Sequence, residues 1–160
     1  FLWAILVPIG FALPDFLPHL AGAYWLVAGI GGGLASMWLG GRDARLNGIS
    51  DRELGRRYGL HWLFTGLAFM LSALPLATGK VAPAAAVPTF MLIAGLAYTL
   101  AGVHLIRPLL WSGLMMLAAY AALQLLPLPY IWTISGIAIA LPLVWAGIVA
   151  RQARHAGNAQ

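Results

Sequence analysis

RDARLNGISDRELGRR, residues 42–57, is the most polar stretch of the chain, and it separates two long apolar segments. Five of the nine basic residues lie in it: Arg42, Arg45, Arg52, Arg56 and Arg57. Arg107 lies between two later apolar segments, and Arg151 and Arg154 follow the last one. Only Lys80 falls in an alternate gap. Basic residues in every second connection are typical of a protein that crosses a bilayer repeatedly and keeps those connections in the cytoplasm.

The composition indicates the same class of protein. Hydrophobic residues make up 62% of the chain and charged residues 8%, whereas soluble domains carry about 25% charged residues. So few polar side chains could not cover a soluble protein of 160 residues, and lipid must therefore contact most of the surface. The formal net charge of +5 comes from the connections. We expect these positive charges to bind anionic lipid headgroups and not nucleic acid.

Six apolar segments approach the roughly 20 residues that a helix needs to cross a bilayer. We predict an all-α, polytopic transmembrane bundle of six spans, arranged as three antiparallel hairpins in a single domain over residues 1–160. The predicted spans cover about residues 1–14, 19–41, 57–77, 88–106, 108–127 and 130–150. The first is short and holds Pro8 and Pro14, so a stub followed by five spans is the alternative. The chain begins at Phe1 and not at Met, which leaves room for upstream residues that would lengthen this span.

The charge pattern also predicts an orientation. When the first span starts in the cytoplasm, eight basic residues lie inside and only Lys80 lies outside. Both termini are then cytoplasmic, and we expect a bacterial-type inner (plasma) membrane. Asn47 and Gly48 indicate a helix C-cap, and the SDRE sequence at 50–53 indicates a capping box. We therefore expect the two neighbouring helices to extend beyond the membrane.

Short glycine steps recur in five of the predicted spans. They read AGI at 28–30, TGL at 65–67, AGL at 94–96, SGL at 112–114 and SGI at 135–137. Steps that begin with a small residue occur in the even-numbered spans, and steps that begin with a hydroxyl residue and end in leucine occur in two odd-numbered spans. This alternation indicates a helical hairpin repeated three times. This arrangement resembles that of small six-helix inner-membrane proteins of the bacterial acid-resistance type. The resemblance implies the six-helix fold and assigns no functional residue.

Small residues let membrane helices approach one another closely. We therefore predict helix packing at Gly29, Gly33, Gly95, Gly113 and Gly136. Gly29 and Gly33 also form a GxxxG motif. This motif would pack either inside the bundle or against a protein partner or second copy within the membrane.

Two histidines are the best candidates for a binding site. His61 lies about a turn inside the cytoplasmic end of the third predicted span, and His104 lies at a similar depth in the fourth. Ionisable side chains within spans are costly and often functional. Two neutral imidazoles at one level could hold a haem iron, and one could ligate the magnesium of a chlorin. The alternative is an ordinary interfacial role, because His, Tyr and Trp are common at the membrane surface, where most of the seven tryptophans also fall.

The acidic residues Asp15, Asp43, Asp51 and Glu53 all fall in predicted connections. Ion-coupled transporters generally need such groups near the middle of the bilayer, so the sequence disfavours that class. No metalloprotease motif, phosphate-binding loop or pair of carboxylates occurs. The chain has no cysteine, which excludes thiol nucleophiles and thiolate metal sites.

We therefore predict a non-enzymatic protein with no catalytic or metal-binding residue. It would be an accessory, assembly or sensing module that acts through helix packing and the Arg-rich connection. The alternative is a tetrapyrrole-binding membrane subunit that uses His61 and His104. A third hypothesis is a facilitator for a small solute or lipid, with a polar path formed by Thr65, Ser72, Thr99 and Ser112.

Overall fold

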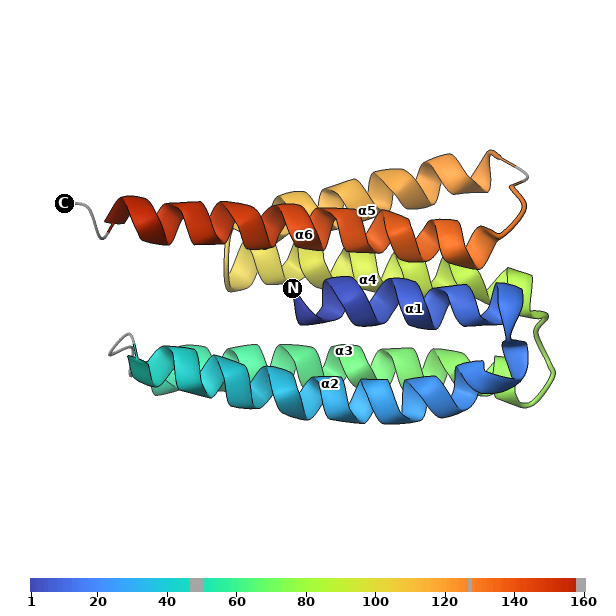
Figure 1. Cartoon of the computed structure of the whole chain (residues 1–160), viewed down its shortest axis with the longest axis horizontal. Coiled ribbons are helices and arrows are strands. Elements are labelled where there is room, and N and C mark those ends of the chain that lie inside the picture. The colour runs from blue at the N-terminus through green and yellow to red at the C-terminus, as the bar shows by residue number, and fades with distance from the viewer. Residues whose placement is uncertain (47–50, 127, 158–160) are drawn as a thin grey trace.

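The computed structural model describes residues 1–46, 51–126 and 128–157, and the regular structure in these residues is entirely helical. Six helices follow one another along the chain (Figure 1): α1 (Leu2–Phe16), α2 (Pro18–Leu46), α3 (Arg52–Ala77), α4 (Pro83–His104), α5 (Pro108–Gln124) and α6 (Ile131–Gly157). The prediction of an all-α bundle is thus confirmed for the described residues. Helices α2, α3 and α6 extend beyond the predicted apolar segments, because polar residues continue each helix at one end.

Four helices are long and apolar enough to cross a membrane. They are α2, α3, the Ala85–His104 part of α4 and the Ile131–Gln152 part of α6. Helices α1 and α5 are apolar but have only 15 and 17 residues. At a rise of about 1.5 Å per residue they reach about 22 and 26 Å, which is less than the hydrocarbon core of about 30 Å.

Local sequence accounts for where several helices begin. Pro18, Pro83 and Pro108 start α2, α4 and α5, where the missing backbone N–H has no helical partner to lose. Asp51 caps α3, since its Oδ1 accepts a hydrogen bond from Leu54 N at 3.0 Å.

The predicted capping box is therefore wrong by one position. Asp51, and not Ser50, is the N-cap of α3. Glu53 does not close a box, because its carboxylate accepts hydrogen bonds from Arg56 and Arg57 instead. Ser50 and the predicted turn at Asn47-Gly48 lie outside the described residues.

Helices α1, α4, α5 and α6 pack together, and α2 and α3 lie to one side of these four (Figure 1). Helix α6 is central and contacts α1, α4 and α5, and the most extensive contact is between α4 and α5. Helix α2 packs mainly on α1, and α3 packs mainly on α4. In the described parts of the chain, α2 and α3 make no extensive contact with each other although they are consecutive. We call α2 and α3 the outlying helices.

An aromatic cluster joins the outlying helices to the other four. The ring of Trp132 in α6 lies 5.7 Å from that of Phe11 in α1 and 5.9 Å from that of Phe90 in α4, measured between centroids. Trp25 of α2 contacts Phe11, and Phe69 of α3 stacks on Phe90. Trp132 is only 5% exposed. This tryptophan, in the first turn of α6, therefore belongs to the core and not to the exposed surface.

A carboxylate ties the first helix to the last. Asp15, near the end of α1, accepts hydrogen bonds from the backbone N and the Oγ1 of Thr133, each at 2.7 Å. Thr133 lies in the first turn of α6, where free N–H groups and the helix dipole favour an anion. Asp15 therefore caps α6 from another helix.

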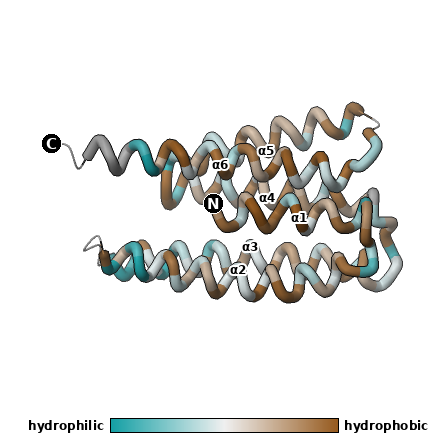
Figure 2. The backbone as a smooth tube through the Cα atoms, viewed as in Figure 1, coloured by the Kyte–Doolittle hydropathy of each residue, from teal (hydrophilic) through white to brown (hydrophobic). Residues whose placement is uncertain are grey.

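The connections alternate between the two ends of the bundle (Figure 1). One end holds the α2–α3 and α4–α5 connections and the end of α6, and all eight arginines lie toward it. The other end holds the remaining three connections and Lys80. Figure 2 shows hydrophilic residues in the last turns of α2, in the first turns of α3 and toward the end of α6. We call the end of the bundle that holds the arginines the arginine end, and the end that holds Lys80 the lysine end.

Candidate functional site

The structure places His61 and His104 in one groove, which we call the histidine groove. It lies at the arginine end between α3 and the end of α4, and its volume is about 420 Å³. Its lining residues are Arg57, Leu60, His61, Phe64, His104 and Leu105. The four from α3 follow the helical repeat of three and four residues, so they share one face of the helix. The groove exists because α4 ends at His104, whereas α3 extends further in the same direction to Arg52.

The imidazole of His61 is held in place by α4. Its Nε2 lies 3.0 Å from the carbonyl oxygen of Ala97. Because a carbonyl oxygen only accepts hydrogen bonds, Nε2 carries the proton, and Nδ1 remains as the acceptor or ligand of the ring. Trp62 packs edge-on against His61 and Tyr98, with centroid distances of 5.1 and 4.9 Å. These contacts fix the orientation of the imidazole and leave Nδ1 as its only nitrogen with a free lone pair.

The rim of the histidine groove carries positive charge. Glu53 accepts hydrogen bonds from Arg56 Nε at 2.9 Å and from Arg57 Nε at 2.8 Å. The hydrogen bonds from Arg56 and Arg57 lower the pKa of Glu53 to about 2, so the carboxylate is ionised at neutral pH. One carboxylate shared by two guanidinium groups leaves a net positive charge beside the groove.

The remaining arginines of the Arg-rich segment lie outside the histidine groove. Arg42, Arg45 and Arg52 are exposed at the facing ends of α2 and α3. The guanidinium of Arg42 lies 5.7 Å from the centroid of Trp38, which is a cation–π distance. The segment therefore presents a broad cationic surface at the arginine end.

The outlying helices form a second candidate site. Among the described residues, Gly32 is the only buried residue of α2, and α3 has none. Many large apolar side chains are exposed on both helices. They include Leu26, Val27, Ile30, Leu34, Met37 and Trp38 on α2, and Leu63, Phe64, Met70, Leu71 and Leu74 on α3. Exposed apolar area of this extent marks a surface for lipid or for another protein.

Three of the predicted packing glycines lie at close helix contacts. A Cβ added at Gly95 would lie 2.7 Å from Leu117 Cδ2, and one added at Gly136 would lie 2.6 Å from Phe11 Cβ. A Cβ added at Gly113 would overlap the backbone nitrogen of Thr99. A larger residue at any of these positions would push two helices apart.

Gly29 and Gly33, the GxxxG motif, differ from these three. A Cβ added at either position would have no atom of another helix of the described chain within 4 Å. Their neighbour Gly32 is the glycine of α2 that packs inside the bundle, since a Cβ there would lie 2.8 Å from Leu6 Cδ1. The motif therefore makes no close helix contact within the described chain.

Sequence reasoning missed several packing glycines. Gly10, Gly32, Gly102 and Gly147 also lie where an added Cβ would meet a neighbouring element. The contact at Gly102 could have been predicted from the sequence. Only three residues separate α4 from α5, so the adjoining ends of these helices must approach closely. The other three stand outside the repeated glycine steps, and only the packing of the helices identifies them.

Three of the four hydroxyl groups of the predicted polar path donate hydrogen bonds to backbone carbonyl groups. Thr65 Oγ1 donates to the carbonyl of His61, and Thr99 Oγ1 donates to that of Gly95, each within its own helix. Ser112 Oγ donates to the carbonyl of Pro142 in α6 at 3.1 Å. These hydroxyl protons are thus used by the protein itself.

Comparison with known proteins gives no assignment. No known protein family matches the chain, and neither a curated protein nor a solved structure matches it significantly. In the described residues, no group of three or more His, Asp or Glu side chains could hold a metal ion. A functional proposal must therefore rest on the two sites described above.

Proposed function

We propose that the protein is a non-enzymatic integral membrane module that assembles with a second copy of itself through α2. The observation that carries this proposal is the exposure of the outlying helices. Both are long and apolar enough to cross a membrane, yet Gly32 is the only buried position among their described residues. Lipid can cover such helices, and a second protein helix can replace the lipid where small residues allow close approach.

The proposed arrangement in the membrane has six crossings in three antiparallel hairpins. The arginine end faces the cytoplasm of a bacterial-type inner membrane, and both termini are cytoplasmic, in keeping with the distribution of basic residues. Helices α1 and α5 are shorter than the hydrocarbon core, and local thinning of the bilayer accommodates them. The Arg-rich segment contacts anionic headgroups and fixes the orientation.

A second copy is the proposed partner because the small residues of α2 lie on one face. Gly22, Gly29, Gly33 and Gly40 follow spacings of seven and four residues, which keep them within a narrow sector of the helix. At all four positions, an added Cβ would have no atom of another described helix within 4 Å. When two copies meet about a two-fold axis, the same face packs against itself, so one glycine face provides both halves of a close contact.

Disulfide cross-linking in native membranes tests this proposal. The chain has no cysteine, so a single introduced cysteine reports contacts without background. Gly29→Cys places a thiol on the glycine face, where space is open. Val27→Cys is the matched control, because it has nearly the same depth in α2 and lies about 200° away around the helix.

We expect oxidation to yield a disulfide-linked dimer of Gly29→Cys and little or none of Val27→Cys. The control position is also exposed, since Val27 is 73% exposed in the single chain. Equal cross-linking of the two variants would indicate random collision, and the absence of cross-linking in Gly29→Cys would exclude the glycine-face dimer.

The histidine groove supports a second candidate function, the binding of haem b or a chlorin. His61 Nδ1 and His104 are the available imidazole ligands, Leu60 and Phe64 offer apolar contacts to a ring system, and Arg57 can pair with a carboxylate side group. The iron of a bound haem would supply a redox centre, and the conjugated ring of a bound chlorin would supply light absorption.

An absorption spectrum of the purified protein with added haemin, before and after dithionite, tests this second candidate. We expect a Soret band and a reducible α-band that disappear in His61→Ala and persist in His19→Ala. His19 is a suitable control because it is exposed in the first turn of α2, outside the histidine groove. A wild-type protein that shows no such bands does not bind haem in this groove.

A further inference from the structure

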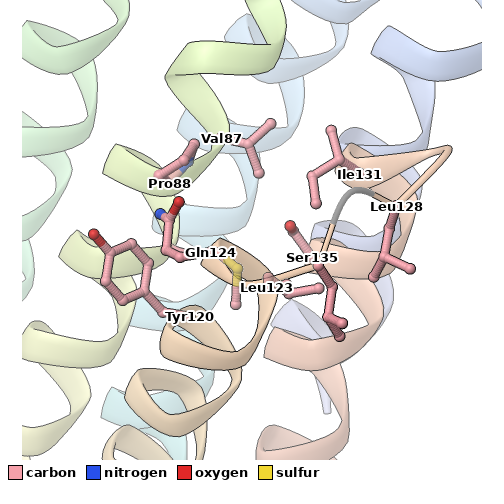
Figure 3. A pocket seen from close by; sticks show the side chains of 10 residues that line it. Val87, Pro88, Tyr120, Leu123, Gln124, Leu128, Ile131 and Ser135 are labelled. Atoms are coloured by element: carbon pink, nitrogen blue, oxygen red, sulfur yellow. The ribbon is translucent and has the colours of Figure 1, made fainter.

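A separate cavity lies between α4, α5 and α6 toward the lysine end (Figure 3). Its volume is about 240 Å³, and its walls are mainly apolar, with Val87 and Met91 from α4 and Ile131 from α6 among them. Three neutral polar side chains also line it, and these are Tyr120, Gln124 and Ser135. No charged side chain is among its described lining residues.

Ser135 is the group that requires an explanation. It is 0% exposed, and its Oγ has no hydrogen-bond partner among the described residues. Folded proteins nearly always satisfy buried hydroxyl groups. Ser112 on the neighbouring helix is equally buried, and it donates to the carbonyl of Pro142. Figure 3 shows the hydroxyl of Ser135 directed into the space between the three helices.

The other two polar groups come from α5. Tyr120 and Gln124 are four residues apart, so they lie on one face of the helix, and Figure 3 shows their side chains next to each other. Gln124 is exposed, whereas Ser135 is fully buried. The cavity thus has an amide at its mouth and an unpaired hydroxyl inside.

We propose that this cavity binds a small neutral amphiphile, whose carbonyl or hydroxyl group forms a hydrogen bond with Ser135. The apolar part of the molecule would contact Val87, Met91 and Ile131. A charged ligand is disfavoured, because no lining side chain could neutralise it in an apolar site. A cavity of about 150 Å³ in another protein holds benzene, and drug-sized sites begin near 300 Å³. The volume here therefore fits one ring or a short chain.

The test uses three probes of similar shape: benzyl alcohol, toluene and benzoate. They differ in having a neutral hydroxyl group, no polar group or a negative charge. The protein is placed in lipid nanodiscs, and the methyl resonance of ¹³C-labelled Met91 is followed by NMR, because Met91 is 1% exposed and lines the cavity. Met70, which is 71% exposed, reports non-specific partitioning of each probe into the lipid.

We expect benzyl alcohol to shift the Met91 resonance in a saturable manner, with benzoate producing no shift. Ser135→Ala should weaken the binding of benzyl alcohol by about three- to tenfold, the usual effect of one lost hydrogen bond, and leave toluene binding unchanged. Ser112→Ala is the matched control and should change neither affinity, because Ser112 does not line the cavity.

The proposal is overturned if Met91 does not respond to benzyl alcohol, because the cavity would then not bind a neutral amphiphile of this size. It is also overturned if Ser135→Ala binds benzyl alcohol as tightly as the wild type does. Neither result would affect the proposed dimer, since none of the lining residues belongs to α2.

Discussion

Asp15 is one of only four acidic residues in the chain. It connects α1 to α6 through Thr133, which is 118 positions further along the chain. Its Oδ2 satisfies both the backbone N–H and the hydroxyl of Thr133. Removal of the carboxylate would leave donors in the first turn of α6 without a partner. At the residue scale, each of the few polar groups between apolar helices therefore contributes to the stability of the fold.

Asp15→Ala should lower the free energy of unfolding by about 1–2 kcal/mol, because a helix cap and two charge-assisted hydrogen bonds are lost. Asp15→Asn retains a neutral acceptor oxygen and should lose less. Denaturation of the protein in mixed micelles, followed by circular dichroism, measures the difference. Identical unfolding of the wild type and both variants would show that the cap contributes nothing to stability.

Glu53 gives a prediction for pH. The hydrogen bonds from Arg56 and Arg57 lower its pKa from 4.5 to about 2. Because the folded pKa lies below the ordinary value, the stabilisation of the first turn of α3 is fully present above about pH 4.5. It is lost as the pH falls through about 2.

Glu53 is the only glutamate in the chain, so labelling with ¹³C-glutamate gives one carboxyl signal to titrate. We expect a midpoint near the lowered pKa in the wild type. In the variant with both Arg56→Gln and Arg57→Gln, the midpoint should return toward 4.5. A wild-type midpoint already near 4.5 would contradict the hydrogen bonds described for Glu53.

At the scale of whole helices, some glycines lie at contacts between helices and others lie on the exposed surface. Gly113 lets α5 approach the backbone of α4 at Thr99, whereas Gly29 on α2 faces open space. Both substitutions to alanine add one methyl group to a helix. Only the substitution at Gly113 inserts it between two packed backbones.

Gly113→Ala should therefore destabilise the monomer by about 1–3 kcal/mol, as overpacking typically does. Gly29→Ala should be neutral or should stabilise it by up to about 1 kcal/mol, because alanine is the better helix former. Unfolding in detergent at a dilution where the protein is monomeric measures both effects. Equal destabilisation by the two variants would contradict the difference in packing.

At the scale of the whole molecule, the alternating connections predict which end a water-soluble reagent reaches. Gly55 and Thr78 are both exposed and lie near opposite ends of α3. In intact cells, a membrane-impermeant maleimide should label Thr78→Cys, and it should label Gly55→Cys only after permeabilisation. Labelling in the reverse pattern would invert the proposed orientation.

The same assay tests the role of the arginines. In Gly55→Cys combined with Arg52→Gln, Arg56→Gln and Arg57→Gln, a larger fraction of Gly55→Cys should be labelled in intact cells. The physical reason is that fewer positive charges would hold this connection on the proposed cytoplasmic side. An unchanged fraction would show that the remaining arginines suffice to fix the orientation.

The sequence by itself determined the number and order of the helices and the gathering of arginines at one end. These features depend on the length of each apolar segment and on charges along the chain, so they can be predicted locally. It also identified His61 and His104 as lying at similar depth, because two consecutive helices joined by a short connection run antiparallel. The shared histidine groove agrees with that expectation.

Only the tertiary structure decided which helix faces meet. Because these helices are apolar on nearly every side, their sequences carry little of the one-sided pattern that would show which face is buried. The separation of α2 from α3, the open GxxxG motif at Gly29 and Gly33 and the core position of Trp132 follow from packing alone. The same is true of the unpaired hydroxyl of Ser135, since whether a buried group finds a partner depends on atoms that other helices bring to it.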